Sequence, residues 1–265
     1  MSGMISDPKI GPSYSLAKLY HLNTVNVPSL RPASNLSNDE LAYGVWGFGV
    51  KDYPTAPKIH LPNTDVKTTM SISEVIGLRQ SVRQWNPKPM SLEKLGTLLR
   101  LGGGIVRTEK LENRTSYFRA APSGGGRYPI EIYPIVFRVQ GLKPGVYHYN
   151  CFDHTLNALQ QDENMEAYFC EQCTVFPAFI QGASIVIAMT AVMERTMSKY
   201  SDRGYRYILL EAGHITQNIS LMSIGLGLGS FSLAGYYEHE IEKILWVDGL
   251  SETLVYTVVV GHPKH

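Results

Sequence analysis

Residues 198–206 of this 265-residue chain read Ser-Lys-Tyr-Ser-Asp-Arg-Gly-Tyr-Arg, and they directly precede the strongest helical pattern in the sequence. Across 203–222, apolar residues recur at spacings of four, three, four and three, namely Ile208, Ala212, Ile215, Ile219 and Met222. This period places them on one face of an α-helix. Two potential proton acceptors, Lys199 and Tyr200, therefore lie just before a long helix.

Shorter patterns surround this helix. Ser71 and Glu74 form a capping-box signature that predicts a helix start, and Ser91 predicts another. Runs rich in β-branched and aromatic residues predict strands at 130–139, 146–150, 156–159, 185–192 and 254–260. Together they predict an α+β domain over residues 66–265, with a mixed central sheet flanked by helices.

Residues 1–65 have a different character. Prolines interrupt every regular pattern there, namely Pro8, Pro12, Pro28, Pro32, Pro54, Pro57 and Pro62. The segment is nevertheless poor in charge for a disordered tail, and it contains Tyr43, Trp46, Phe48 and Tyr53. We therefore expect an irregular but ordered N-terminal arm that wraps on a partner surface.

Composition narrows the class of protein. The formal net charge of +1 argues against a nucleic-acid-binding surface. No apolar run approaches the length of a membrane span, and the N-terminus lacks the apolar region of a secretory signal, so we expect a cytoplasmic protein. Three cysteines (Cys151, Cys170 and Cys173) are too few for a disulfide scaffold, and their spacing with His148 and His154 fits no compact zinc module. We predict no metal site.

Arg79-Gln-Ser-Val-Arg83 places two arginines four residues apart at an expected helix end. A guanidinium group binds phosphate with two parallel hydrogen bonds, so the segment suits an anionic ligand. A solvated basic helix end would look the same.

Pro122-Ser-Gly-Gly-Gly-Arg-Tyr-Pro129 is a second unusual segment. Successive glycines allow the backbone to approach a planar ligand closely, because no Cβ intervenes. An ordinary glycine turn before a strand is the alternative. A third glycine-rich stretch, Gly225-Leu-Gly-Leu-Gly-Ser230, is not preceded by a strand, which excludes a nicotinamide-binding fingerprint.

The motifs at 79–83, 122–131 and 198–206 together resemble the flavin-dependent dehydrogenases of the nitroreductase superfamily. Within that superfamily they are most similar to the azoline dehydrogenases of streptolysin-type and microcin-type peptide synthetases, over residues 70–262. Tyr20 to Thr24 also weakly resembles a segment near the start of these enzymes. The resemblance implies a nitroreductase-like fold and a homodimer that holds FMN between its subunits. The flavin contacts it implies are Arg79, Gln80, Ser81, Arg83, Pro122, Ser123, Gly124, Gly125, Gly229, Ser230 and Lys264.

The resemblance also implies a reaction. Such enzymes oxidise peptide thiazolines or oxazolines to thiazoles or oxazoles, with Lys199 and Tyr200 as the catalytic pair. An azoline-containing precursor peptide and a cyclodehydratase are the implied partners. Free Lys and Tyr have pKa values of about 10.4 and about 10, so the base needs a lowered pKa, for which we expect a cation such as Arg203 nearby. The residues leave open which of the two is the base.

Three other functions remain open at this stage. The first is a general nitroreductase or quinone reductase that uses a nicotinamide donor. The second is a dehydrogenase of the same fold that acts on other peptide or carrier-bound substrates. The third is a scaffold subunit without chemistry, which would purify without flavin colour.

Overall fold

The computed structural model describes residues 15–26, 51–63, 66–111 and 114–264. Its centre is a sheet of eight described strands in the order β1-β7-β6-β5-β8-β10-β2, and β9 also pairs with β10. The bounds are β1 Lys58–His60, β2 Trp85–Asn86, β5 Ile130–Val136, β6 Gly145–Asn150, β7 Thr155–Gln161, β8 Ile185–Val192, β9 Gly229–Leu233 and β10 Glu252–Pro263. Every described pair of these strands is antiparallel. Among the residues that the structure describes, parallel pairing is limited to isolated bridges, Ser81 with Ser230 and Met90 with Val139.

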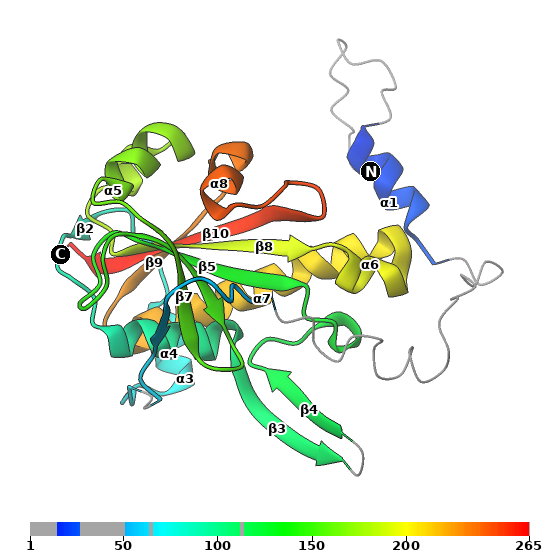
Figure 1. Ribbon diagram of the computed structural model, residues 1–265, viewed down its shortest axis with the longest axis horizontal. Coiled ribbons are helices and arrows are strands. Elements are labelled where there is room, and N and C mark those ends of the chain that lie inside the picture. The colour runs from blue at the N-terminus through cyan, green and yellow to red at the C-terminus, as the bar shows by residue number, and fades with distance from the viewer. Residues whose placement is uncertain (1–14, 27–50, 64–65, 112–113, 265) are drawn as a thin grey trace, which may run out of the picture.

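Helices cover both faces of this sheet (Figure 1). The described helices are α1 Leu16–Asn23, α3 Ile72–Leu78, α4 Leu92–Gly103, α5 Met165–Tyr168, α6 Glu194–Tyr200, α7 Gly204–Gly225 and α8 Glu238–Leu245. α4 and α7 pack on one face, and α5 and α8 pack on the other. Ile187 of β8 points into the first layer and Val186 into the second. Burial on both faces explains why β8 is almost continuously apolar instead of alternating.

The local signals place the helix starts correctly. Ser71 Oγ accepts a hydrogen bond from the Glu74 backbone N–H at 3.3 Å, and Glu74 Oε2 accepts one from the Ser71 N–H at 2.7 Å. Ser91 caps α4 in the same way, through the Lys94 N–H at 3.4 Å. α7 runs three residues past the predicted end at 222. α4 packs closely against α7. A Cβ on Gly102 of α4 would lie only 2.7 Å from Ile219 Cγ1 of α7.

The N-terminal segment is not irregular throughout, which corrects the expectation from its prolines. It contains α1 and β1, and β1 pairs antiparallel with β7 through Ile59 and Leu156. Lys51 Nζ also bonds Glu252 Oε2 at 2.6 Å, so the end of the arm joins the body of the sheet. These are contacts with distant strands, which local proline spacing does not reveal. Tyr43, Trp46 and Phe48 lie outside the described residues, and the boundary at residue 65 stays a prediction.

The sequence patterns missed several elements, among them α1, α5, α6 and α8 and the short strands β1, β2 and β9. Strands β3 (Ile105–Leu111) and β4 (Arg114–Arg119) form a separate hairpin that projects from the body (Figure 1). Within the ranges described, no helix combines the length and apolarity needed to cross a bilayer.

Candidate functional site

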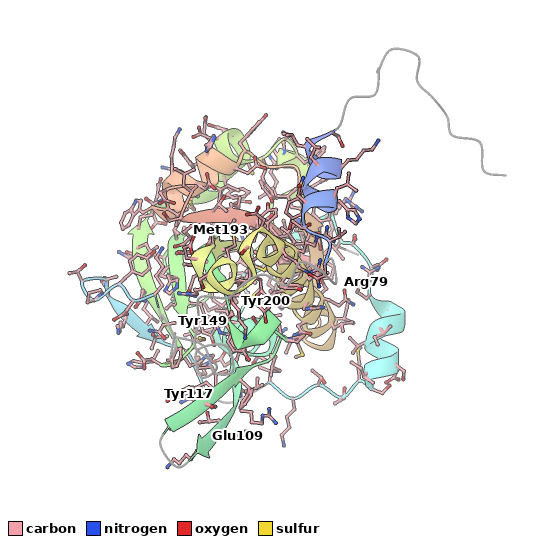
Figure 2. All side chains as sticks on the ribbon, turned by 90° about the vertical axis from the view of Figure 1, so that its right-hand side faces the viewer. Arg79, Glu109, Tyr117, Tyr149, Met193 and Tyr200 are labelled. Carbon is pink, nitrogen blue, oxygen red and sulfur yellow. The ribbon has the colours of Figure 1, made fainter. Side chains whose placement is uncertain are left out.

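Lys199 and Tyr200 lie in the corner between α6 and α7. α6 ends at Tyr200 because Ser201 adopts a positive φ of 48°, and α7 begins at Gly204. Gly204 allows this tight corner, since a Cβ there would lie 3.1 Å from the backbone of Met197. Lys199 and Tyr200 therefore lie just before the long helix, as the sequence predicts, and Figure 2 labels Tyr200 there.

The glycine turn lies directly against this pair. A Cβ on Gly125 would overlap the hydroxyl of Tyr200 and would lie 3.2 Å from Lys199 Nζ. Gly125 also has a φ of 64°, a conformation that favours glycine. A Cβ on Gly124 would lie 3.2 Å from Tyr207 Cβ on α7. The structure therefore brings together Pro122–Gly126 and Lys199-Tyr200, which are some 75 residues apart in sequence.

Two neighbouring glycines provide a test of this contact. Gly125 and Gly126 have nearly the same positive φ, 64° and 65°, but a Cβ on Gly126 would meet nothing within 4 Å. Gly126→Ala should therefore cost only the backbone strain, about 1–2 kcal/mol. Gly125→Ala should cost the same strain and also displace Tyr200. We expect urea unfolding to show a larger loss of stability for Gly125→Ala, and equal losses would contradict the packing.

Aromatic and cationic groups contact Lys199 and Tyr200 and their neighbour Tyr207. The rings of Tyr200 and Tyr207 meet edge to face, with centroids 4.9 Å apart at 83°. Lys199 Nζ lies 5.4 Å from the Tyr200 ring centroid. Arg203 Nε donates a hydrogen bond to the Tyr207 hydroxyl at 2.9 Å. Tyr207 thus fixes the orientation of the Tyr200 ring.

The electrostatics of the pair separate its two members. Burial lowers the pKa of Lys199, and the charge of Arg127 lowers it further. Burial raises the pKa of Tyr200, with Tyr207 adding to this effect and Arg127 opposing it. A lowered pKa makes the neutral amine of Lys199 more available, whereas a raised pKa keeps Tyr200 protonated. The environment therefore favours Lys199 as the proton acceptor.

The cation beside Lys199 is not the one expected. Arg203 points away from Lys199, because it donates to Tyr207 and to the backbone oxygen of Thr24. Arg127, 6% exposed, takes that place. Sequence reasoning missed Arg127, although its position directly after three glycines of the turn was a usable signal.

α1 packs beside the corner between α6 and α7. Tyr20 donates its hydroxyl to the backbone oxygen of Asp202 at 3.1 Å. Arg206 bonds Thr24 Oγ1 and the backbone oxygen of His21, each at 2.7 Å. The weakly matched segment Tyr20 to Thr24 is therefore held on the first turns of α7.

The remaining predicted ligand residues meet elsewhere. The Val82 backbone N–H donates a hydrogen bond to the Ser230 backbone oxygen at 2.9 Å. The Lys264 backbone N–H donates one to the Gln84 backbone oxygen at 3.0 Å. A Cβ on Gly229 would lie 2.7 Å from Val82 Cγ2, so glycine permits this close approach. Residues 80–84, 224, 228, 263 and 264 line an open cavity of about 280 Å³. Among its lining residues are four of the predicted contacts, Gln80, Ser81, Arg83 and Lys264.

Arg79 lies at a helix end, as the sequence predicts: it caps the C-terminus of α3 and has an extended backbone. Arg83 lies beyond that end, outside the helix. The Arg83 guanidinium lies 4.6 Å from the Phe231 ring centroid, a stacking contact that fixes its direction. Ser230 lies buried in strand β9.

The two groups of predicted residues lie at opposite ends of α7. Tyr207 faces the glycine turn near the start of the helix, and Ile224 lines the second cavity near its end. At 1.5 Å per residue, these two positions are about 26 Å apart along the axis. Figure 1 shows α3, which ends at Arg79, and α6, which ends at Tyr200, toward opposite ends of α7. One chain therefore does not bring all the predicted ligand residues around one molecule.

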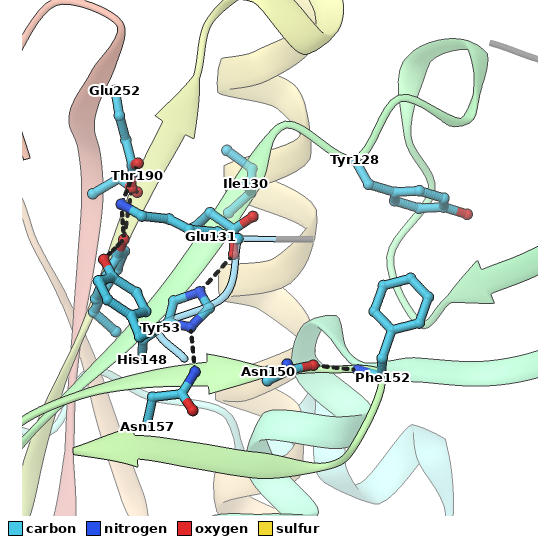
Figure 3. Close-up of polar contacts among 12 residues, drawn as sticks. Tyr53, Tyr128, Ile130, Glu131, His148, Asn150, Phe152, Asn157, Thr190 and Glu252 are labelled. Atoms are coloured by element: carbon cyan, nitrogen blue, oxygen red, sulfur yellow. Dashed lines mark hydrogen bonds and ion pairs between the residues drawn. The ribbon is translucent and has the colours of Figure 1, made fainter. Parts of the chain in front are cut away.

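A buried charge cluster connects β5, β6 and α6, and Figure 3 shows its contact between Glu131 and His148. Glu131 Oε2 lies 2.8 Å from His148 Nε2, and Glu131 Oε1 forms an ion pair with Arg195 at 2.5 Å. Burial alone would raise the pKa of Glu131. The hydrogen bond with His148 and the charges of Arg195 and Arg119 outweigh burial and hold the pKa at about 2. His148 is thus a satisfied residue of strand β6.

This lowered pKa predicts how stability depends on acid. An unfolded Glu has a pKa near 4.5, so Glu131 stabilises the fold above that pH, and the effect is lost as the pH falls through about 2. The difference corresponds to about 3 kcal/mol. Glu131→Gln should be less stable than the native chain at pH 7 by about this amount. The difference in the free energy of unfolding between the two proteins should close near pH 2. Urea unfolding checks this, with the exposed Glu194→Gln as control. A gap that stays constant with pH would contradict it.

The comparisons with known proteins agree with this architecture. The sequence profile of the Nitroreductase family matches residues 76–262, so the chain belongs to the nitroreductase family, a family of oxidoreductases. Among curated proteins, it is 34% identical to the nitroreductase-type protein MJ1384 of Methanocaldococcus jannaschii, over 71% of this chain and 89% of that protein. It is 30% identical to the trifolitoxin-processing protein TfxB of Rhizobium leguminosarum bv. trifolii, over 68% of this chain.

Solved structures show the same fold. A nitroreductase of Anabaena variabilis superposes with a TM-score of 0.71 at 25% identity, covering 92% of this chain and 45% of that one. The Escherichia coli microcin synthetase McbBCD, solved with truncated pro-MccB17 bound, contains a chain that matches with a TM-score of 0.60 at 19% identity, covering 92% and 86%. This chain spans about half the length of TfxB (49%) and of the Anabaena protein.

Proposed function

We propose that this protein is an FMN-dependent dehydrogenase that oxidises thiazoline or oxazoline rings of a ribosomal precursor peptide to thiazoles or oxazoles. The observation that carries the proposal is the packing of the Pro122–Gly126 turn against Lys199 and Tyr200 in a chain of the nitroreductase family. Similarity to a trifolitoxin-processing protein, and a shared fold with a microcin synthetase chain, supports a peptide as substrate.

The residues present fit FMN. Gly125 and Gly126 are exposed, and the space where a Cβ on Gly126 would stand is open, so a planar ring can approach the backbone of the turn. At the other end of α7, the 280 Å³ cavity is lined by Arg83 and Lys264, cations suited to a phosphate. We assign the ring to Pro122, Ser123, Gly124 and Gly125. We assign the rest of FMN to Arg79, Gln80, Ser81, Arg83, Gly229, Ser230 and Lys264.

These two groups complete one site only if they come from two chains. We therefore propose a symmetric homodimer in which the turn of one subunit faces the cavity of its partner. The exposed side chains of Leu209 and Leu210 on α7, and of Ile72 and Ile76 on α3, provide apolar surface for such an interface.

The reaction removes two hydrogens from the azoline ring. Bound FMN would supply the hydride acceptor. The chain's own part is to take the proton from the ring carbon next to the electron-withdrawing group, and Lys199 in its neutral form suits this role. Tyr200 keeps its proton and can donate a hydrogen bond that orients the substrate. The azoline itself must be made first, so a cyclodehydratase is the partner that this reaction requires.

The proposal is tested on the purified protein. We expect a yellow protein that releases FMN on denaturation and lowers the mass of an azoline peptide by two hydrogens. Release of FAD, or no flavin after reconstitution, would refute the cofactor. The similarity to MJ1384 makes a general nitroreductase the second candidate. Rapid turnover of nitroarenes with a nicotinamide donor, without azole formation, would favour that candidate.

A further inference from the structure

A second buried carboxyl group, Glu211, lies beneath the glycine turn. Glu211 is 2% exposed and stands one helical turn after Tyr207, which packs against Gly124. The hydroxyl of Ser123 and the backbone at Ile130 are the hydrogen-bonding groups next to its carboxyl. Within the described structure, Glu211 Oε2 has no hydrogen-bond partner. The proposed reaction makes no use of this group.

Ser123 connects Glu211 to the proposed flavin surface. Ser123 Oγ already accepts a hydrogen bond from the Tyr128 backbone N–H at 2.8 Å. A serine hydroxyl has one hydrogen to donate and two lone pairs. One hydrogen and one lone pair therefore remain, to be divided between Glu211 and a ligand on the turn.

The protonation state of Glu211 decides this division. An ionised carboxylate only accepts, so the Ser123 hydroxyl then donates to Glu211 and offers the ligand a lone pair. A neutral carboxyl group can donate to Ser123, which frees the hydroxyl hydrogen for an acceptor on the ligand. The same serine thus presents opposite hydrogen-bonding roles in the two states.

The surrounding charges keep both states accessible. Burial raises the pKa of Glu211. This effect is opposed by hydrogen bonds from Ser123 and the Ile130 backbone and by the charges of Arg119 on β4 and Arg195 on α6, which leave the pKa at about 7. Arg195 is already paired with Glu131, which also bonds His148. Cys151 lies near the same arginines, and burial raises its pKa. The two guanidinium groups therefore do not hold Glu211 fully ionised.

We propose that Glu211 is a positioning residue that switches Ser123 from acceptor to donor toward bound flavin when Glu211 takes up a proton. The inference rests on the proposed function, because it takes Ser123 as a flavin contact. Glu211→Gln is the informative variant, since its amide donates permanently and so imitates the neutral acid.

The experiment measures FMN affinity by fluorescence quenching from pH 6 to pH 8. The native protein should show a change of about 2- to 13-fold, the effect of one ordinary hydrogen bond, with a midpoint near pH 7. Glu211→Gln should lack this step and keep the native low-pH affinity throughout. Ser123→Ala should lack it too, whereas the exposed Glu194→Gln should retain it. If the FMN phosphate itself titrates in this range, its effect on affinity also appears in the Glu194→Gln curve.

Each outcome decides a different point. A step that survives in Glu211→Gln or in Ser123→Ala overturns the inference, as does FMN binding without a step in the native protein. If Glu211→Gln fails to fold, Ser123→Ala against the native protein decides alone. No FMN binding by the native protein overturns the proposed function, and the inference with it.

Discussion

Lys199→Ala should keep FMN bound and the fold intact but slow azole formation by ~100- to 10,000-fold, the usual cost of losing a general base. The reason is that Lys199 is the member of the pair whose pKa its surroundings lower, through burial and Arg127. Tyr200→Phe should lose less, because Tyr200 stays protonated and its ring still packs on Tyr207. The measurement is anaerobic single-turnover bleaching of bound FMN by an azoline peptide.

The pH profile separates base catalysis from a structural role. The native rate should rise with pH as Lys199 loses its proton, with an inflection below the 10.5 of free lysine. Lys199→Ala should lose that inflection. Lys243→Ala and Tyr237→Phe, exposed positions on and beside α8, serve as matched controls and should behave like the native enzyme. Native rates in both Lys199→Ala and Tyr200→Phe would refute the assignment, and flavin loss in either is detected by its absorbance.

Mixing two inactive variants should restore activity if the site is shared between chains. Arg79→Glu reverses an exposed charge at the cavity end of α7 and should prevent FMN binding by repelling the phosphate. Lys199→Ala should bind FMN but not react. In a mixed dimer, one site receives the native Arg79 from one chain and the native Lys199 from the other.

The size of the recovery is set by the symmetry. Random pairing makes half of the dimers mixed, each with one intact site, so about a quarter of the native activity should return. The control is the same mixture kept as preformed homodimers, which should stay inactive. No recovery after co-expression, or a flavin-loaded monomer by light scattering, would show that each chain builds its own site.

Much of the fold follows from short-range patterns. The capping box at Ser71, the apolar period of α7 and the strands around 130, 146, 156, 185 and 254 all appear where the sequence predicts them. Each depends on residues only a few positions apart. β1 and β9 were missed because a short strand is defined by its pairing partner, here β7 or β10, and not by its own composition.

For the candidate site too, the sequence predicted one part and the tertiary structure decided the other. By itself, the sequence predicted which segments would carry chemistry, because glycines, arginines and a Lys-Tyr pair are chemical types that need no neighbours to be recognised. Only the tertiary structure decided that Arg127 and not Arg203 lies beside Lys199, that Glu211 is buried under Ser123, and that the two groups of ligand residues stand at opposite ends of α7. These are relations of charge, burial and distance between segments remote in the chain, and they exist only after the chain has folded.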